Sequence, residues 1–302
     1  EEENKKMKEL EGVIALIPTP LTTEGELDEA GLKNLIDFDL ANGCNGVGVL
    51  AAIGEGYLFN AAETERVVRA AVKAVNGRAP LIVGCPAMGT TAAVESCRKA
   101  EDWGADAILA FNPKYKGFDA YNIKHLVPHY TAMARAVRIP LVPYSQLDDP
   151  IPLDVLKSLV EDGLIRHIKY GPHDCATLQR IIAELGDKLY IFAGADTFIL
   201  RHLMLGVKGI SIATAALFPR ECSEIVRLVR EGSIEEARSL YRRSVIYWND
   251  IGFYNCWQSV HKIALRLMGI IESDRCLPPL IPAEDFQVAE VRSLLEFLGK
   301  IS

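Results

Sequence analysis

The sequence predicts a (β/α)₈ TIM barrel, an α/β fold in which eight parallel strands close into a cylinder inside a ring of helices. Short apolar runs alternate with segments of helical periodicity eight times in succession. The apolar runs are nearly continuous, as expected of parallel strands that helices cover. The eight units occupy about 230 residues, which matches a single closed barrel. An open doubly wound sheet is the alternative, but it gives no reason for the series to stop at eight.

The strands and helices are expected in strict alternation along the chain. A strand is expected at each short apolar run, and a helix where apolar residues recur at i, i+3 and i+4. The expected strands are Gly12–Pro18, Gly46–Leu50, Pro80–Cys85, Ala107–Phe111, Pro140–Tyr144, Ile165–Lys169, Leu189–Gly194 and Gly209–Ala213. The helices that follow them are Asp28–Ala41, Ala61–Val75, Thr91–Trp103, Tyr121–Val137, Leu153–Glu161, Ala176–Leu185, Phe198–Leu205 and Pro219–Arg230.

The alternation ends at Gly232. We expect residues 1–232 to form the barrel with a charged N-terminal leader, and residues 233–302 to form a C-terminal extension packed on it. Three helices are expected in the extension: Ile234–Trp248, Trp257–Met268 and Ala283–Leu298. The apolar face that joins the extension to the barrel is expected to include Trp248, Tyr254 and Trp257.

The composition is that of a globular protein without a nucleic-acid or membrane surface. Apolar residues make up 49% and charged residues 24% of the 302 residues. The formal net charge is −7 and the pI is about 5.5, which argues against binding to nucleic acid or to anionic membranes. No apolar run is long enough to cross a bilayer, and the charged N-terminal residues lack the apolar core of a signal peptide.

The seven cysteines are scattered, odd in number and never arranged as CxxC. Reduced, buried thiols are the better interpretation, and they indicate a cytoplasmic protein. The sequence also lacks an HExxH motif, a P-loop and a GxGxxG that opens a helix. We therefore expect neither a metal nor an organic cofactor.

The strongest candidate for chemistry is Lys169, which ends the strand Ile165–Lys169. In barrels of this kind the active site lies where strands end. Lysine is seldom buried, because removing an unpaired ammonium from water is costly. Burial lowers the pKa of a lysine, and the free amine can attack a ketone to form a Schiff base. The alternative is a lysine that reaches past the strand end and pairs with a surface carboxylate.

Tyr144 ends the preceding strand, so its phenol is expected beside Lys169. Schiff-base chemistry needs a group that moves protons between the carbinolamine and the departing hydroxyl, and a phenol can do this. The alternative is a rim tyrosine that packs its ring and bonds water. The position next to Lys169 favours the catalytic interpretation.

Several short motifs carry a resemblance to a known family. They are Gly12–Leu21, Gly54-Glu55, Asn112–Tyr115, Pro140–Tyr144, Ile168-Lys169, Gly194–Asp196 and Gly209–Ser211. Each motif is weak alone. In this order and spacing, the chain resembles the dihydrodipicolinate synthase and N-acetylneuraminate lyase family. The resemblance implies a (β/α)₈ barrel that binds a 2-keto acid, usually pyruvate, as a lysine Schiff base.

Residue by residue, the resemblance implies that Lys169 is the Schiff-base lysine and Tyr144 the proton-relay tyrosine. Tyr115 falls on the family's second tyrosine, which reaches into a neighbouring subunit's site. The alternative is a loop ring that covers its own barrel. Because the family is commonly a tetramer built from dimers, we expect a homo-oligomer, either a dimer or a tetramer.

The turn after the second strand departs from the family. Family members carry Gly-[Thr/Ser]-Thr-Gly-Glu there, and its hydroxyls and amides hold the carboxylate of the keto acid. This chain has Ala51, Ala52 and Ile53 before Gly54-Glu55, so both hydroxyls are absent. Losing two neutral hydrogen bonds costs on the order of 1–3 kcal/mol of binding unless backbone amides suffice. Glu55 itself is expected to be structural.

The proton relay and the second-substrate pocket depart as well. The relay hydroxyl is missing, so water, Ser145 or the substrate must replace it. In the synthases an arginine five residues after the relay tyrosine grips the second substrate's carboxylate, but here that position is Asp149, beside Asp148. An acidic pair repels a dicarboxylate and favours hydroxyls or an amine. Dihydrodipicolinate synthase itself is therefore disfavoured.

The resemblance adds further substrate-binding candidates at the ends of the last two strands: Gly194, Asp196, Ile210 and Thr214. Asp196 and Thr214 fall where the sialate-cleaving members bind sugar hydroxyls, although helix capping accounts for Asp196 equally well. His173, which follows Lys169, is a possible pocket residue, and His167 is expected to fill the barrel.

We therefore predict a class I lyase or aldolase in which Lys169 condenses with pyruvate or another 2-keto acid and Tyr144 moves protons. The iminium then acts as an electron sink for retro-aldol cleavage, aldol addition or dehydration. Two alternatives stay open. One is an enzyme whose carbonyl substrate lacks the usual carboxylate, and the other is a barrel that has lost its chemistry and binds a small molecule. Ala52 and Ile53 motivate both.

Overall fold

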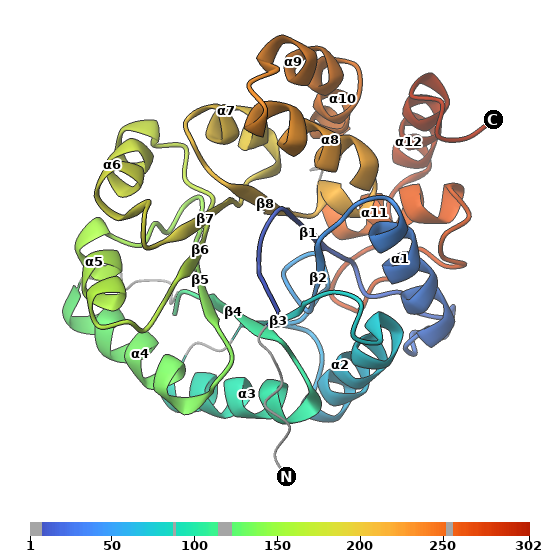
Figure 1. The fold of residues 1–302 in the computed structure, drawn as a ribbon. Helices are drawn as coiled ribbons and strands as arrows, with labels where there is room; N and C mark the ends of the chain where they lie inside the picture. Colours follow the sequence, from blue (N-terminus) through green and yellow to red (C-terminus); the bar gives the residue numbers. More distant parts are fainter. Residues whose placement is uncertain (1–7, 87–88, 114–122, 252–255) are drawn as a thin grey trace.

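Eight parallel strands form a closed barrel, as predicted. The computed structural model of the chain describes residues 8–86, 89–113, 123–251 and 256–302. Each strand pairs with its neighbours in sequence, and β8 closes the barrel on β1 (Figure 1). The strands are β1 (Val13–Leu16), β2 (Gly46–Val49), β3 (Leu81–Cys85), β4 (Ala107–Phe111), β5 (Leu141–Ser145), β6 (His167–Tyr170), β7 (Tyr190–Ala193) and β8 (Gly209–Ile212).

Helices follow the strands and surround the barrel (Figure 1). Side-chain caps start some of them; at α2, for example, the Asn60 side chain accepts from the Ala62 and Glu63 amides and the Glu63 side chain accepts from the Asn60 amide. The helices are α1 (Glu29–Ala41), α2 (Ala61–Val75), α3 (Thr90–Trp103), α4 (Ile123–Ala136), α5 (Leu153–Glu161), α6 (Cys175–Leu185), α7 (Ile199–Met204) and α8 (Pro219–Arg230). Two 3₁₀ turns, η1 (Asp196–Phe198) and η2 (Thr214–Ala216), follow β7 and β8.

The alternation of side chains along the strands divides the core into two layers. Successive residues of a strand point to opposite faces of the sheet. On β6, Ile168 and Tyr170 pack in the outer layer between the strands and the helices. His167, by contrast, stacks on Phe192 of the inner layer, with ring centroids 6.3 Å apart. Lys169 shares the parity of His167, so its side chain enters the barrel.

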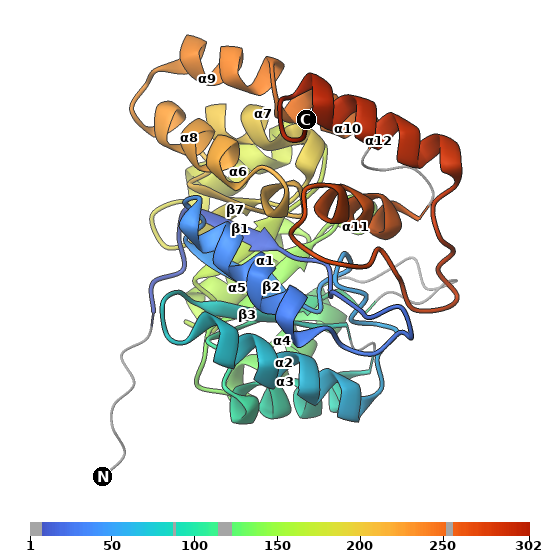
Figure 2. The same ribbon diagram turned by 90° about the vertical axis from the view of Figure 1, so that its right-hand side faces the viewer.

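The C-terminal extension contains four helices in the described part of the chain, where three were expected. They are α9 (Ile234–Arg242), α10 (Val245–Ile251), α11 (Trp257–Leu267) and α12 (Asp285–Phe297). The predicted helix Ile234–Trp248 breaks at Ser244, whose hydroxyl donates to the Leu240 carbonyl at 2.6 Å. A side-chain bond of this kind bends a helix. The extension lies on the side of the barrel formed by α7, α8 and α1 (Figures 1 and 2).

Aromatic contacts join the extension to the barrel. Trp248 is fully buried and packs against Phe218, with ring centroids 6.0 Å apart. Its indole N–H donates to His261 Nε2 of α11 at 3.3 Å. Trp257 packs against the inner layer of the barrel. The two tryptophans therefore make the contacts expected of them, whereas Tyr254 lies outside the described residues.

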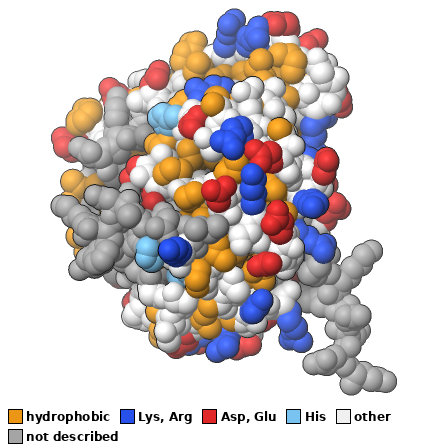
Figure 3. All heavy atoms as spheres, turned by 90° about the vertical axis from the view of Figure 1, so that its left-hand side faces the viewer, with side chains coloured by type: hydrophobic (Ala, Val, Ile, Leu, Met, Phe, Trp, Pro, Cys, Tyr) orange, Lys and Arg blue, Asp and Glu red, His pale blue; other side chains and the backbone are white. Residues whose placement is uncertain are grey.

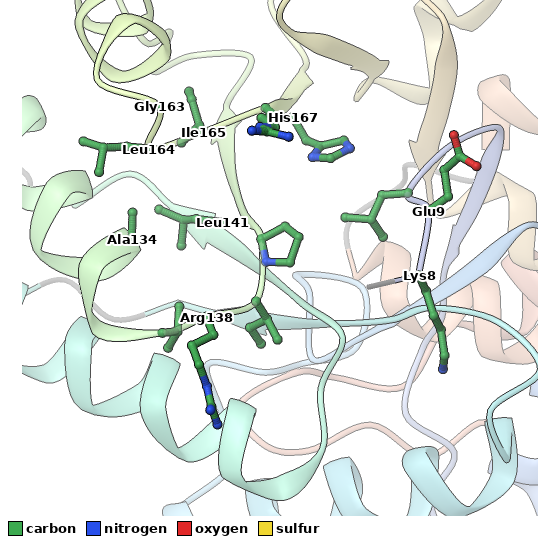
Figure 4. A pocket seen from close by; sticks show the side chains of 14 residues that line it. Lys8, Glu9, Ala134, Arg138, Leu141, Gly163, Leu164, Ile165 and His167 are labelled. Carbon is green, nitrogen blue, oxygen red and sulfur yellow. The ribbon is translucent and has the colours of Figure 1, made fainter. Parts of the chain in front are cut away.

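The N-terminal end of the barrel is closed by Leu10, which packs into the inner layer, and by His167. Burial lowers the pKa of His167 to about 4, so the ring is neutral and fills space as predicted. Beside them lies a hollow of about 590 Å³ with aliphatic walls that include Leu141 and Ile165 (Figure 4). It opens at the end of the strands opposite to the end where active sites of such barrels occur.

Acidic and basic side chains are interspersed over the outer helices. Figure 3 shows this mixture on the face formed by α4, α5 and α6. Lys157 of α5 pairs with Glu184 of α6, and Arg180 pairs with the same carboxylate at 3.5 Å. In the described part of the chain, no helix is both long and apolar enough to span a membrane.

Asp39 of α1 is a fully buried acid. Its side chain is not exposed, and neither carboxylate oxygen has a hydrogen-bond partner among the described residues. Burial raises the pKa of Asp39 well above its ordinary value. The neighbouring thiols of Cys44 and Cys222 also have raised pKa values, for the same reason. Burial therefore favours the protonated form of Asp39 in the folded chain.

This burial predicts that Asp39→Asn stabilises the fold increasingly as pH rises. An acid whose pKa is higher in the folded state supports folding below its unfolded pKa and loses that support as pH rises toward its folded pKa. Asparagine does not titrate, so the difference in unfolding free energy should grow by up to about 1.4 kcal/mol per pH unit above about pH 4. Urea unfolding of the variant and of the wild type at about pH 5 and about pH 7 measures this difference in unfolding free energy. Asp37→Asn is the control, because ion pairs with Lys33 and Arg78 lower the pKa of Asp37. If the difference in unfolding free energy between Asp39→Asn and the wild type does not change with pH, the prediction is contradicted.

Candidate active site

Lys169 and Tyr144 lie side by side at the C-terminal ends of β6 and β5. The two residues face each other in the parallel register of these strands. Lys169 Nζ lies 3.9 Å from the centre of the Tyr144 ring. Phe111, the matching residue of β4, packs edge-on against the same ring with centroids 5.6 Å apart. The two strand ends thus bring the amine and the phenol together, as expected from the sequence.

The amine of Lys169 is buried without a salt-bridge partner among the described residues. Only 5% of the residue is exposed. Desolvation lowers the pKa of Lys169 to about 8, and the carboxylate of Asp196 opposes this shift. The face of the Tyr144 ring also favours the charged amine. Because desolvation outweighs these effects, much of the amine is uncharged, and nucleophilic, near pH 8.

The hydroxyl of Tyr144 lies in the same corner of the barrel as the Lys169 side chain. It is 3.5 Å from the Gly194 carbonyl oxygen, which is long for a hydrogen bond, so the hydroxyl is free to bond another group. Burial raises the pKa of Tyr144 above its ordinary value, and Asp196 and Asp148 add to this. The phenol therefore stays protonated at neutral pH and can donate a proton.

Gly194 leaves the space that the Lys169 side chain occupies. A β-carbon at residue 194 would lie 2.6 Å from Lys169 Cγ and 3.0 Å from Lys169 Cε. Gly194 also donates its amide to the Tyr170 carbonyl at 2.7 Å, which fixes the end of β7 beside β6. A larger residue at this position would displace the lysine stem. The structure thus gives Gly194 a steric role next to the amine.

Asp196 links the ends of β7 and β8. Its Oδ1 accepts a hydrogen bond from the Thr214 amide at 2.7 Å, at the start of η2. The same carboxylate acts electrostatically on Lys169 and on Tyr144. Thr214 is buried, and its hydroxyl has no hydrogen-bond partner among the described residues. Asp196 is not the N-cap residue of η1 or α7, so its contacts are the bond to the Thr214 amide and the electrostatic interaction with the amine.

Ala52 and Ile53 form the turn after β2. The Ile53 side chain is 1% exposed and packs in the inner layer with Ala51. The main-chain N–H groups of Ala52 and Ile53 have no hydrogen-bond partner in the described part of the chain. The turn offers no side-chain hydroxyl at these positions, as the sequence indicated, but it offers two main-chain donors.

Glu55 is held in an ion pair with Lys262 of α11. It is fully buried, and its Oε1 lies 2.5 Å from Lys262 Nζ of α11. Its Oε2 accepts a hydrogen bond from the Leu277 amide at 2.6 Å. These contacts fit the structural role expected for Glu55.

The side chains of Ser145 and Ile210 do not point to the face of the sheet that carries Lys169, and a role of these two residues in substrate binding stays a prediction. Ser145 follows Tyr144 on β5 and therefore points to the opposite face of the sheet. Its hydroxyl accepts a hydrogen bond from the Ile151 amide at 3.0 Å. Ile210 packs in the outer layer, against the helices. Both side chains stabilise the wall of the barrel.

Asp149 lies in the loop after β5, which is tied to the end of β4. Its carbonyl accepts from the Asn112 side chain at 2.8 Å. One of its carboxylate oxygens is buried and has no hydrogen-bond partner among the residues described. Asp149 stands at the position where the resemblance implied an arginine. In the described part of the chain, no lysine or arginine forms a salt bridge with its carboxylate.

Three further expectations concern Tyr115, His173 and metal ions. Tyr115 lies outside the described residues, so its contact with a neighbouring subunit stays a prediction. His173 is exposed, and its ring packs against Phe198 with centroids 4.4 Å apart. Among the described residues, no group of three or more His, Cys, Asp or Glu side chains could hold a metal ion.

Gln258 and Lys262 of α11 support the site and were missed by the sequence analysis. Lys262 binds Glu55, and the Gln258 side chain lies 3.4 Å from the Ala52 carbonyl oxygen. One signal was available in the sequence: Lys262 lies between Val260 and the apolar residues Ile263–Leu265. A charged residue on an apolar face requires a buried partner.

Proteins of known family match this chain over most of its length. The sequence profile of the Dihydrodipicolinate synthetase family matches residues 9–298. The 4-hydroxy-tetrahydrodipicolinate synthase of Syntrophobacter fumaroxidans is 31% identical over 294 residues, which is 96% of this chain and 99% of that protein. The enzyme of the same name from Pelobacter propionicus is 29% identical, with the same coverage.

Solved structures agree with these relatives. The chloride-inhibited dihydrodipicolinate synthase from Acinetobacter baumannii, complexed with pyruvate, has a TM-score of 0.90 and 27% identity, covering 97% of this chain and 100% of that one. Dihydrodipicolinate synthase from Aquifex aeolicus has a TM-score of 0.87 and 27% identity, and the match covers 95% of this chain and 97% of that one. The predicted barrel and the prediction of an enzyme of the class I Schiff-base lyases are thereby confirmed. The chain belongs to the dihydrodipicolinate synthetase family.

Proposed function

We propose that this chain is a Schiff-base-forming lyase or aldolase that acts on pyruvate or another 2-keto acid through Lys169. The observation that carries the proposal is the buried amine of Lys169, 3.9 Å from the ring centre of Tyr144 and with a pKa lowered to about 8. A neutral amine in a poorly hydrated site is the nucleophile that condenses with ketones. The Acinetobacter baumannii relative, solved with pyruvate, favours a 2-keto acid as the electrophile.

The proposed reaction begins with attack of the Lys169 nitrogen on C2 of the keto acid. The carbonyl electron pair moves to oxygen, the nitrogen gives up a proton and the oxygen gains one, which yields a carbinolamine. Tyr144 then donates its proton to the carbinolamine hydroxyl. Water leaves as the nitrogen lone pair forms the iminium. The Tyr144 phenolate recovers a proton from C3, and the resulting enamine forms or breaks a carbon–carbon bond.

The main chain of the turn after β2 is proposed to bind the carboxylate of the keto acid. Ala52 and Ile53 bring no hydroxyl, but their N–H groups are unpaired within the described residues. Backbone donors form charge-assisted hydrogen bonds with carboxylates, each worth about 1.5–3 kcal/mol. Two such bonds would hold the carboxylate without the hydroxyl contacts that the family adds to them.

The second substrate is proposed to carry hydroxyl or amino groups and not two carboxylates. Asp148 and Asp196 both raise the pKa of Tyr144, so the corner that faces the iminium is acidic. Asp149 adds a further carboxyl group in the same loop. Like charges would repel a dicarboxylate. The proposed reaction therefore differs from that of the relatives in its second partner.

Borohydride trapping tests the proposed function directly. Reduction of the protein with pyruvate present should add one reduced pyruvate unit to the intact mass, and peptide mapping should locate it on Lys169. Lys169→Ala should abolish labelling, whereas Lys157→Ala, which changes a surface lysine on α5, should not. A wild-type protein that gains no adduct from any member of a panel of 2-keto acids refutes the proposal.

The lowered pKa of Lys169 predicts how adduct formation depends on pH. The attacking amine must be unprotonated, so the initial rate at subsaturating pyruvate should rise with pH and level off above about 8, the pKa set by desolvation. Cyanoborohydride trapping between about pH 6 and about pH 10 measures this profile, since an exposed lysine titrates near 10.4. A rate that keeps rising to the top of that range indicates a hydrated amine.

Restoring a hydroxyl at residue 53 should tighten binding of the keto acid. In Ile53→Thr the pyruvate concentration for half-maximal trapping should fall about 2- to 10-fold, the value of one neutral hydrogen bond. Ile53→Val is the matched control, because valine has the shape of threonine without the hydroxyl. If threonine and valine behave alike, the side chain at residue 53 does not face the carboxylate.

A further inference from the structure

One face of α11 holds the turn after β2 from outside the barrel. Lys262 and Glu55 form an ion pair at 2.5 Å in which both side chains are 0% exposed. Lys262 Nζ also donates to the Arg275 carbonyl at 2.6 Å, and Glu55 accepts from the Leu277 amide at 2.6 Å. These bonds join the turn, the helix and the segment after the helix into one buried network.

Gln258 contacts the same turn one helical turn before Lys262. Its Nε2 lies 3.4 Å from the Ala52 carbonyl oxygen and 3.0 Å from the Tyr57 hydroxyl oxygen. Gln258 is only 4% exposed. Residues four apart share a helix face, so Gln258 and Lys262 support the turn at both of its ends.

The backbone of the turn needs such support. Glu55 has φ 58°, in the left-handed region, which costs a residue with a side chain about 1–2 kcal/mol. A β-carbon at Gly56 would lie 2.0 Å from the Leu50 carbonyl oxygen, so the chain passes unusually close to β2 there. From the barrel side, the Thr19 hydroxyl donates to the Gly54 carbonyl at 2.7 Å. The main chain is therefore held between the barrel and α11.

We propose that Lys262 and Gln258 are positioning residues for the carboxylate of the keto acid, an inference that rests on the proposed function. The side chains of Ala52 and Ile53 supply no donor, so carboxylate binding depends on where their N–H groups are placed. Hydrogen bonds weaken steeply when distance or angle departs from the optimum. By anchoring the turn, α11 sets the affinity for the carboxylate without touching the substrate.

Labelling with two ketones distinguishes an effect on the placement of the turn after β2 from an effect on the stability of the whole protein. Pyruvate carries the carboxylate that the turn would bind, whereas acetone forms a Schiff base with the same amine and has no carboxylate. Lys262→Met removes the cation and keeps the length of the side chain. The pyruvate concentration for half-maximal borohydride labelling should rise about tenfold or more, while the value for acetone should change less than about twofold.

Two further variants sharpen the experiment. Gln258→Leu keeps the ion pair and removes the contacts of the amide with Ala52 and Tyr57, so it should raise the pyruvate value less than Lys262→Met does and leave acetone unchanged. Arg266→Met is the matched control. Arg266 lies one turn further along α11 and pairs with Asp274 at 3.0 Å, with both side chains partly exposed. This control should change neither ketone.

Equal losses for both ketones would show that Lys262 only stabilises the fold, and they overturn the inference. Unchanged pyruvate labelling in folded Lys262→Met and Gln258→Leu overturns it as well, as does a wild-type chain that acetone labels and pyruvate does not. A wild-type chain labelled by neither ketone instead contradicts the proposed function. If circular dichroism shows that Lys262→Met does not fold, Gln258→Leu decides the result alone.

Discussion

The site depends on one lysine amine kept out of water against the face of a tyrosine ring. Removing an ammonium from water is costly, and a protein meets this cost by pairing the charge or by giving up the proton. Lys169 has no salt-bridge partner among the described residues, and desolvation lowers its pKa to about 8, so it loses its proton more readily than an exposed lysine does. The parallel register that places Tyr144 beside it, and the empty volume at Gly194 that admits its stem, are both consequences of how β5, β6 and β7 lie next to one another.

Two lysines are buried among the described residues, and their surroundings assign them opposite tasks. Lys262 has the Glu55 carboxylate at 2.5 Å and donates to the Arg275 carbonyl, so it is held in an ion pair and ties α11 to the barrel. Lys169 has no such partner in the described part of the chain, and the nearby Asp196 already accepts from the Thr214 amide. A paired ammonium is structural, whereas an unpaired amine can become a nucleophile. The buried lysine of the barrel is thus the candidate nucleophile, whereas the buried lysine of the extension has a structural role.

The sequence alone predicts the barrel because eight strand-helix units leave few ways to bury their apolar faces. It also predicts the meeting of Lys169 and Tyr144, because the ends of neighbouring parallel strands lie side by side. Finer features depend on contacts that no local pattern contains. The Ser244 hydroxyl bonds the Leu240 carbonyl where the helix breaks after Arg242, and the Ser145 hydroxyl accepts from the Ile151 amide of its own loop. The Glu55–Lys262 pair joins segments far apart in the chain, so only the folded structure reveals it.

A crystal structure of the chain soaked with pyruvate tests the central claim most directly. The account predicts continuous electron density from Lys169 Nζ to C2 of the keto acid, with the Tyr144 hydroxyl beside it. The carboxylate should lie within hydrogen-bonding distance of the Ala52 and Ile53 amides. Pyruvate bound elsewhere, or a free Lys169 amine surrounded by ordered water, would contradict the account.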